Sequence, residues 1–271
     1  MKSIKELKLL ANDNRKRIIE MIYRAKAGHP GGSLSIIDIL TAIYELDVDF
    51  KNEKRSRVVL SKGHAVPAQY AILNYKGIIG DEELATFRHV DSRLQGHPHI
   101  VDIPEVDSTT GLLGQGLSLA IGMAMAKRND NEDNRVYAIV GDGELHEGQI
   151  WEGIMQAAHY KLNNLVMIVD YNKLSSSGPV NEVIRVDSVS DKLKVFGFNT
   201  IEINGNDMEQ VVGALEVAIN EKEKPTAIIA NTIKGKDVSF MENNPKWHSG
   251  ALTDDEYKIA MNDINKVREE I

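Results

Sequence analysis

The sequence has 271 residues, of which 42% are hydrophobic and 27% are charged, and its formal net charge is -8. These proportions are typical of a folded globular protein, and the acidic charge argues against a nucleic-acid surface. The absence of cysteine excludes disulfides and thiolate metal sites, and no apolar run is long enough to span a membrane. Because the N-terminus also lacks the apolar core of a signal peptide, we expect a cytoplasmic protein without a membrane partner.

The first third of the chain is expected to be mainly helical. Apolar residues recur at helical spacing over residues 3–26, which predicts a long helix with one buried face. The run from Gly28 to Gly32 combines four glycine or proline residues with His29, so no regular element is expected there. Ser33 is a candidate N-cap for a helix over residues 34–45. Further elements are predicted at residues 57–60 (a strand), 66–75 and 117–127 (helices).

The stretch from residue 136 to residue 178 is the most informative part of the chain. A buried strand is predicted over residues 136–140, an amphipathic helix over 148–160 and a second buried strand over 165–169. Asp142 follows the first strand and Asn172 follows the second. Because right-handed crossovers bring the ends of successive parallel strands to the same edge of a sheet, these two side chains should be neighbours.

Two neighbouring oxygen ligands suit a hard cation such as Mg²⁺ or Ca²⁺. Mg²⁺ usually takes one or two protein carboxylates and completes its shell with phosphate oxygens. The alternative is that both residues merely form turns, since Gly-Asp-Gly and Asn-Lys are common turn sequences. Their fixed positions at the two ends of one strand-helix-strand unit favour a site for a metal and a phosphate-bearing ligand.

The remaining elements complete an alternating pattern. They are a helix over 189–196, a strand over 199–203, a helix to Asn220 capped by Asp207, a strand over 226–231, an irregular segment over 234–248, and a final helix to about Glu270 begun by a Thr253 cap. This alternation predicts one doubly wound α/β domain over residues 1–271, with a mainly parallel sheet flanked by helices. The sequence contains neither GxGxxG after a strand nor GxxxxGK[ST], which argues against a dinucleotide oxidoreductase or a P-loop NTPase.

Four of the eight histidines lie in glycine-flanked loops: His29, His64, His97 and His248. Imidazoles can donate hydrogen bonds to phosphate or sugar oxygens and can exchange protons near neutral pH. For any single histidine, a structural hydrogen bond to nearby backbone is an equally good interpretation. Four histidines in such loops of one chain are harder to explain in this way, which favours a functional role.

Together these motifs resemble those of the transketolase family. Gly141-Asp142-Gly143, followed after 28 residues by Asn172, is similar to the thiamine-diphosphate motif. Four further segments resemble transketolase in particular and keep the family's order along nearly the whole chain: Gly28-His29-Pro30-Gly31, Ser61-Lys62-Gly63-His64-Ala65, Gly96-His97-Pro98 and Gly111-Leu112-Leu113-Gly114-Gln115-Gly116. The resemblance implies the thiamine-diphosphate-binding fold, and specifically its diphosphate-binding domain.

The resemblance also implies how the cofactor would be held. Asp142 and Asn172 would bind the divalent ion (Mg²⁺, or Ca²⁺ or Mn²⁺) through their side chains, and Leu174 would add its backbone carbonyl. Gly143 would allow the backbone to approach the diphosphate of thiamine diphosphate. His64 and His248 would hydrogen-bond diphosphate oxygens, and His248 would also lie near the reacting centre.

Other matching positions imply contacts with substrates, with the cofactor rings and with a second protein chain. His29 and His97 would contact the donor sugar, so that the four loop histidines form the catalytic set, and Arg88 would lie near the acceptor. Gly111 and Leu113 would line the two rings of the cofactor, although the family usually has proline at Leu112. Glu147 would belong to a carboxylate network at a dimer contact, or it is simply a solvated glutamate favoured by the helix dipole.

The length of the chain changes what the resemblance implies. A full transketolase is more than twice as long, and this sequence matches only its first domain. We therefore expect the N-terminal subunit of a split transketolase of the pentose phosphate pathway, acting as a heterotetramer with two copies of each chain. The separate C-terminal subunit would supply the pyrimidine-binding and C-terminal domains, including the glutamate that activates the cofactor. The assembly would transfer a two-carbon ketol unit from a ketose phosphate to an aldose phosphate.

Three alternatives remain open. A specialised ketolase for an unusual sugar phosphate would carry the same loops. One chain of a thiamine-dependent dehydrogenase or decarboxylase would share Gly-Asp-Gly and Asn172 but not this set of histidine loops. A catalytically silent regulatory subunit is the third alternative, against which the intact metal pair and the histidines argue.

Overall fold

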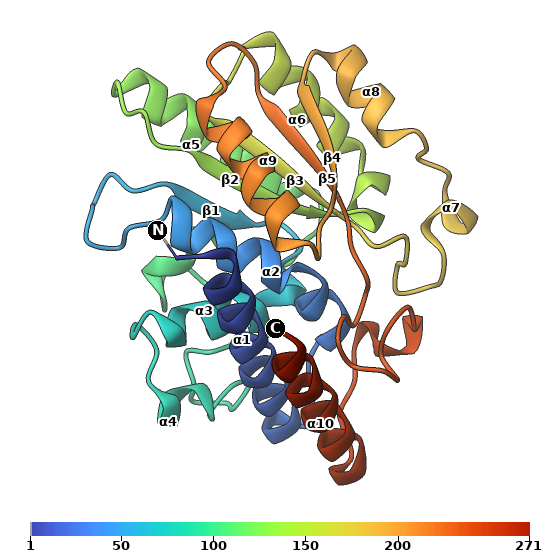
Figure 1. The fold of residues 1–271 in the computed structure, drawn as a ribbon. Coiled ribbons are helices and arrows are strands. Elements are labelled where there is room, and N and C mark those ends of the chain that lie inside the picture. The colour runs from blue at the N-terminus through green and yellow to red at the C-terminus, as the bar shows by residue number, and fades with distance from the viewer. Residues whose placement is uncertain (1) are drawn as a thin grey trace.

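A parallel sheet of five strands forms the centre of the computed structural model, which describes residues 2–271 (Figure 1). The strand order is β1-β2-β3-β5-β4, and each neighbouring pair is parallel. This arrangement confirms the predicted doubly wound α/β fold. The strands are β1 (Arg57–Leu60), β2 (Val136–Gly141), β3 (Leu165–Tyr171), β4 (Asn199–Asn204) and β5 (Thr226–Asn231).

Helices cover both faces of the sheet and enclose two hydrophobic clusters. One face is covered by α1 (Ile4–Ala25), α2 (Pro30–Leu46), α3 (Val66–Tyr75) and α9 (Met208–Asn220), and α10 (Asp254–Glu270) packs on α1. The other face is covered by α5 (Gln115–Asn129), α6 (Gly148–His159) and α8 (Val189–Phe196). The short helices are α4 (Asp81–Leu84), α7 (Val180–Val183) and the 3-10 turns η1 (Gly63–Ala65), η2 (Pro104–Val106), η3 (Gly143–His146) and η4 (Pro245–His248).

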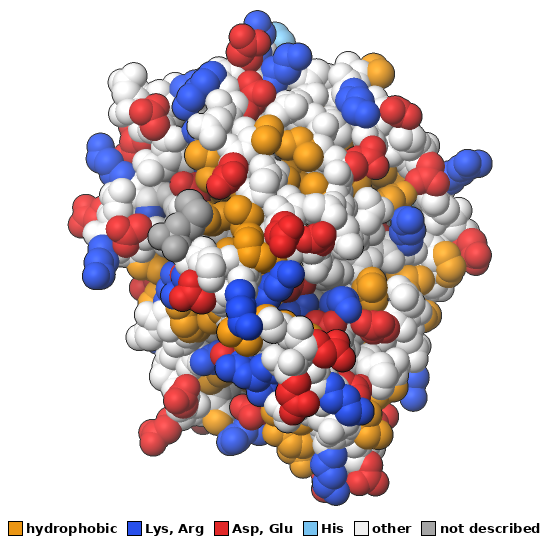
Figure 2. Space-filling view, viewed as in Figure 1, with side chains coloured by type: hydrophobic (Ala, Val, Ile, Leu, Met, Phe, Trp, Pro, Cys, Tyr) orange, Lys and Arg blue, Asp and Glu red, His pale blue; other side chains and the backbone are white. Residues whose placement is uncertain are grey.

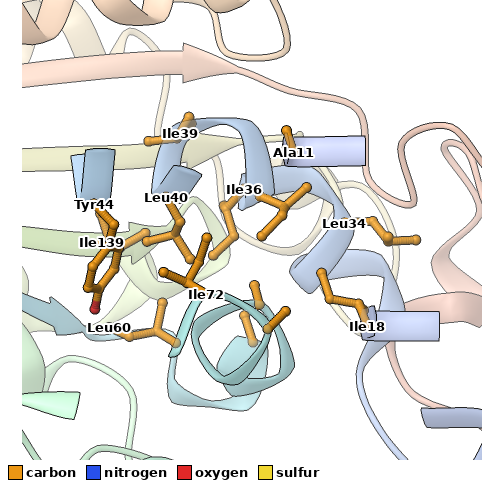
Figure 3. Close-up of a cluster of buried hydrophobic side chains, with 14 of the residues drawn as sticks. Ala11, Ile18, Leu34, Ile36, Ile39, Leu40, Tyr44, Leu60, Ile72 and Ile139 are labelled. Carbon is orange, nitrogen blue, oxygen red and sulfur yellow. The ribbon is translucent and has the colours of Figure 1, made fainter. Parts of the chain in front are cut away.

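Burial on both faces explains why the central strands are continuous apolar runs. In β2, Tyr137 and Ile139 belong to the cluster under α2, whereas Ala138 and Val140 belong to the opposite cluster. Successive strand residues point to opposite faces, so both sets must be apolar. Figure 3 shows the first cluster, where Ile139 of β2 lies among the side chains of α2 and α3.

One predicted boundary is wrong. The run from Gly28 to Gly32 was expected to hold no regular element, but α2 begins at Pro30 and His29 is its N-cap. Proline is favoured at the first helical position because its φ is preset and its missing N–H would be unpaired there anyway. Ser33 therefore lies inside the helix, where its hydroxyl donates to the His29 carbonyl at 2.8 Å.

The glycines at the start of α2 allow close packing against the C-terminal segment. A Cβ at Gly31 would lie 2.7 Å from the backbone oxygen of Trp247, closer than van der Waals contact permits. The helix therefore starts in contact with the loop that carries His248. This contact joins residues near the two ends of the chain.

None of the helices within residues 2–271 is both long and apolar enough to cross a membrane. On the face drawn in Figure 2, acidic and basic side chains are interspersed, with small apolar areas between them. Histidine atoms appear only at the upper edge of this face, so the histidine cluster described below does not open here.

Candidate functional site

A pocket of about 240 Å³ lies at the carboxyl ends of β1, β2 and β3. This edge is where open α/β sheets bind ligands. The following residues line it: Gly32, Lys62, His64, Leu113, Gly141, Asp142, Gly143, Glu144, His146, Asn172, Leu174, Ser175, Ser176, Ser177, Val183, Lys234 and His248.

Asp142 presents a buried carboxylate at the end of β2, where only 2% of the residue is exposed. Its Oδ1 accepts from the Gly143 N–H at 2.8 Å, and its other oxygen accepts from the Lys173 N–H just beyond β3. Burial, and then the nearby charge of Asp170, raise the pKa of Asp142 to about 7. A nearby cation would therefore stabilise the ionised form of this side chain.

Asn172 faces the same pocket as Asp142, as the strand crossover predicted, and Leu174 also lines it. The Asn172 amide nitrogen donates to Asp170 Oδ2 at 3.0 Å, and its oxygen accepts from the Leu174 N–H at 3.1 Å. The Leu174 carbonyl accepts from the ammonium group of Lys234 at 2.8 Å. A positive group therefore already contacts the carbonyl that was expected to bind a metal.

Lys62 and Lys234 place two buried ammonium groups at the pocket, each residue being only 2% exposed. Lys62 forms an ion pair with the fully buried Asp170. Burial alone would raise the pKa of Asp170, but Lys62 and the hydroxyls of Thr232 and Ser35 lower it below its usual range. Burial and the charge of Lys62 lower the pKa of Lys234 to about 8.

The four loop histidines lie together, as predicted. The ring centroid of His29 lies 5.2 Å from that of His64, 5.6 Å from that of His248 and 6.4 Å from that of His97, and the centroids of His64 and His248 are 5.1 Å apart. Their loops follow α1, β1, α4 and β5, so the cluster depends on the whole topology. Within residues 2–271, His29 Nδ1 is among the few buried side-chain atoms without a hydrogen-bond partner, which leaves a polar atom free for a ligand.

These imidazoles are held in their neutral form. Burial, and then the charge of Arg88, lower the pKa of His29 to about 4. Burial and the charge of Lys234 lower the pKa of His248 to about 4. The pKa of His64 falls well below its usual value through burial and Lys62, and that of His97 falls through burial and Arg88. Neutral imidazoles can donate one hydrogen bond and accept another at neutral pH.

Of the two predicted ring-lining residues, Leu113 lines the pocket and Gly111 does not. Leu112, 80% exposed, lies on the surface beside Leu113. Gly111 lies against the His97 ring, because a Cβ built on it would be 3.4 Å from that ring. Gly114 has a left-handed φ of 84° and caps α5, and a Cβ there would lie 2.9 Å from Cβ of Glu147.

Five predicted site residues do not line the pocket: His29, Arg88, His97, Gly111 and Glu147. The Arg88 guanidinium lies over Gly96, where a Cβ would come within 2.7 Å of it, and its charge acts on both His29 and His97. Glu147 is the N-cap residue of α6.

Four charged residues were not singled out from the sequence: Lys62, Glu144, Asp170 and Lys234. Glu144 is buried, accepts from the Ser61 hydroxyl and from the N–H groups of Gly114 and Gly141, and thereby joins three loops. Lys62 and Asp170 lie at the ends of predicted strands, and their burial could have been inferred from those positions. Lys234 follows β5, and only the adjacency of β5 to β3 brings it to the pocket.

The donors fit a divalent cation bound together with a phosphate group. Within residues 2–271 no three His, Cys, Asp or Glu side chains are grouped to hold a metal alone. Asp142, the Asn172 amide oxygen and the Leu174 carbonyl are hard oxygen donors that leave coordination positions for ligand oxygens. The two ammonium groups and the free His29 nitrogen suit an anionic ligand with hydroxyl groups.

Comparison with known families identifies the kind of domain to which the chain is similar. The family model described as transketolase, thiamine diphosphate binding domain, matches residues 6–265. An apulose-4-phosphate transketolase subunit from Phocaeicola vulgatus is 42% identical over 269 residues, which cover 97% of this chain and 95% of the relative. The 6-deoxy-6-sulfo-D-fructose transketolase subunit SqwG of a Clostridium species is 40% identical over 266 residues, covering 96% and 97%.

Longer proteins match the chain over only part of their length. Human transketolase is 37% identical over 258 residues, which cover 92% of this chain but 40% of the human protein. The crystal structure of transketolase from Campylobacter jejuni superposes with a TM-score of 0.90 at 34% identity, covering 98% of this chain and 43% of that one. The chain therefore spans less than half of each longer protein.

Proposed function

The chain belongs to the transketolase family, through its thiamine diphosphate-binding domain, and from this premise we propose that it is the diphosphate-binding subunit of a two-chain transketolase. The whole chain would form one diphosphate-binding domain. With its partner it would transfer a two-carbon ketol unit between sugar phosphates. Thiamine diphosphate, when bound, would supply the reactive carbon that carries this unit.

One observation carries the proposal: the candidate metal donors lie beside the four-histidine cluster. Asp142 and Asn172 line the pocket together with His64 and His248, and His29 adjoins both of these histidines. A metal-phosphate site alone would need no such cluster. A cluster of neutral imidazoles beside that site suits a hydroxyl-rich substrate next to a diphosphate.

The chain would hold the cofactor mainly by its diphosphate. Asp142, Asn172 and the Leu174 carbonyl would bind Mg²⁺, or Ca²⁺ or Mn²⁺, which would also bind diphosphate oxygens. His64, His248 and the backbone at Gly143 would donate hydrogen bonds to the same group. Lys62 and Lys234 would add positive charge where the diphosphate brings negative charge, which supports anion binding in a buried pocket.

Substrate contacts would come from residues at the outer side of the pocket. His29 and His97, kept neutral by burial and by Arg88, would donate to and accept from sugar hydroxyls and would move protons with His248. Arg88, whose charge reaches both rings, would bind the acceptor's negative group. Gly111 and Leu113 would line the cofactor rings, and Glu147 would contact a second copy of the site.

The partner would be a separate subunit with the pyrimidine-binding and C-terminal domains, in an assembly with two copies of each chain. Two nearly full-length relatives carry the word subunit in their names, which supports such a division. The exposed side chain of Leu112 at the pocket entrance also supports a second chain that covers this edge.

A specialised ketolase is the second candidate. The relatives at 42% and 40% identity are named for apulose 4-phosphate and for 6-deoxy-6-sulfo-D-fructose, and both match almost the whole chain. This favours an unusual ketose over the common donors of the pentose phosphate pathway. The mechanism of this chain's residues would be the same in either case.

The test is to purify the chain with and without the product of the adjacent reading frame and to assay ketol transfer. Xylulose 5-phosphate, apulose 4-phosphate and 6-deoxy-6-sulfofructose serve as alternative donors, with Mg²⁺ and thiamine diphosphate present. Activity should require both chains, and the preferred donor decides between the two candidates. Full activity of the chain alone would contradict the split assembly.

Asp142→Ala in the same complex should abolish activity because a metal donor is lost, whereas Asp130→Ala, exposed at the end of α5, serves as the control and should retain it. An active Asp142→Ala complex would refute the metal assignment. Transfer from none of the donors by the two-chain complex would contradict the proposed function.

A further inference from the structure

Asp170 is a buried carboxylate directly behind the pocket, at the next-to-last position of β3. It accepts hydrogen bonds from four side chains: Ser35 of α2 at 2.7 Å, Asn172 at 3.0 Å, Lys62 and Thr232. These residues come from α2 and from the ends of β1, β3 and β5. Asp170 does not line the pocket, so it would act on a ligand only through its neighbours.

The contact with Asn172 sets which end of the amide faces the pocket. A carboxylate accepts hydrogen bonds and cannot donate, so the NH₂ end of the amide must face Asp170. The oxygen of Asn172 is thereby turned away from Asp170, toward the side where Leu174 and Asp142 lie. Only the amide oxygen can bind a cation, so a flipped amide would present two hydrogens to it.

The contact with Lys62 sets the charge of the pocket. Lys62 lines the pocket and, apart from Asp170, its ammonium group donates to the Gly32 carbonyl at 3.0 Å. Asp170 cancels that positive charge directly behind the metal donors. Without this carboxylate the pocket would become more positive by one unit, which repels a divalent cation and attracts a free diphosphate.

We propose that Asp170 is a positioning residue that makes cofactor binding depend on the divalent cation. It does so by turning the Asn172 oxygen toward the metal position and by neutralising Lys62. This proposal rests on the proposed function, because it assumes that the pocket binds thiamine diphosphate with a metal. It assigns to Asp170 the coupling between the two ligands and not merely the stability of the fold.

The coupling can be measured directly as the ratio of the affinity for thiamine diphosphate with Mg²⁺ to the affinity with EDTA. Thiamine diphosphate binding to the full chain is measured by titration calorimetry with Mg²⁺ and with EDTA, and free Mn²⁺ is counted by electron paramagnetic resonance in parallel. In Asp170→Asn, the Mn²⁺ affinity in the presence of thiamine diphosphate should fall by about tenfold or more, because one unit of nearby negative charge is lost. Affinity for thiamine diphosphate in EDTA should stay unchanged or rise.

A purely structural role predicts a different result, in which both affinities fall together. Asp38→Asn is the matched control, because it removes one carboxylate from another buried ion pair, that of Arg15, outside the pocket. Its ratio of affinities should equal that of the wild type.

A double variant that restores the net charge separates the effect of Asp170 on charge from its effect on the orientation of Asn172. Lys62→Met combined with Asp170→Asn removes both charges and should recover part of the metal dependence that Asp170→Asn loses. Buried ion pairs often tolerate replacement of both members, so this variant also serves if Asp170→Asn does not fold. In that case Lys62→Met alone is the reference, and the double variant should bind Mn²⁺ more weakly because it lacks both the charge of Asp170 and its hold on the Asn172 amide.

The outcomes are distinct. Wild-type chain that binds no thiamine diphosphate, with or without the partner subunit, contradicts the proposed function itself. Metal-dependent binding by the wild type with the same ratio in Asp170→Asn overturns the present proposal alone. A loss of Mn²⁺ affinity with retained affinity in EDTA supports it.

Discussion

At the scale of single residues, the site combines neutral imidazoles with two buried ammonium groups. The pKa values of His29 and His248 are both lowered to about 4, in each case first by burial and then by a neighbouring cation. These rings therefore remain neutral at any pH near 7. Substrate hydroxyls would meet hydrogen-bonding groups that carry no charge of their own.

The lowered pKa values predict a loss of stability in acid. Between about pH 6.5 and pH 4 the unfolded chain binds protons at His29 and His248 that the folded chain does not, so the free energy of unfolding falls as the pH falls through this range. The double variant His29→Asn/His248→Asn should lose less between pH 7 and pH 5 than the wild type. We expect a difference of about 1–2 kcal/mol, allowing for the partial exposure of both rings.

Urea unfolding at pH 7 and at pH 5 measures this difference. His159→Asn, which replaces an exposed histidine at the end of α6, is the control and should behave like the wild type. Identical pH dependence in the wild type and the double variant would mean that the two rings are not held neutral by the fold.

Individual site residues could be predicted to different degrees. Asp142, Asn172 and the four loop histidines were found because motif spacing and strand ends place them, and the structure brings them together. Lys234 could not be found in this way, because its position depends on β5 lying beside β3 rather than on any local pattern. The burial of Asp170 likewise depends on partners far away in the sequence, Ser35 and Lys62 among them.

At the scale of elements, a long connection between α3 and α5 carries His97 and Gly111 with little regular structure of its own. Asp107 links this connection to Arg55 and Val58 at the start of β1. Asp107 has a left-handed φ of 65° and is 3% exposed. Its carboxylate accepts from the two terminal guanidinium nitrogens of Arg55 at 2.9 and 2.8 Å and from the Val58 N–H at 2.9 Å.

Asp107→Ala should therefore lower the free energy of unfolding by about 3–5 kcal/mol, because it leaves the buried Arg55 guanidinium without its partner. Asp102→Ala, in the same connection, removes an exposed pair with His99 and should cost at most about 1 kcal/mol. Urea denaturation of both variants gives the comparison. Equal effects would show that the connection is not held by Asp107.

Most elements could be predicted from periodicity and caps, and the exception has a physical reason. Helical spacing and buried runs place the five strands and the long helices, and Thr253 forms the expected capping box with Glu256. The start of α2 was missed because glycine and proline normally end helices. Here Gly31 is required by the contact with Trp247, a residue more than two hundred positions away.

On the scale of the whole molecule, apolar side chains remain exposed at the pocket entrance. Leu112 is 80% exposed and Leu113, which lines the pocket, is 38% exposed. An exposed apolar area beside a ligand site is typical of a surface that another chain covers. The order of the strands and the place of this area follow from long-range packing and could not be predicted from local sequence.

Thiamine diphosphate should bind at least about tenfold more tightly when the partner subunit is present, because the partner would close the exposed side of the pocket. Leu112→Asp should reduce this gain without changing binding to the chain alone. Val195→Asp replaces a similarly exposed side chain on α8 and is the control. Calorimetry with and without the partner measures the gain, and a Leu112→Asp chain that gains as much as the wild type would contradict a partner at this surface.

The contact between His29 and His248 has a consequence for biosynthesis. A ribosome that makes this chain adds the second histidine more than two hundred residues after the first. No nascent chain or early-terminated product that ends before His248 can therefore carry the assembled cluster. If His248 binds the diphosphate as proposed, chains that end before this residue would lack one of the contacts to the cofactor.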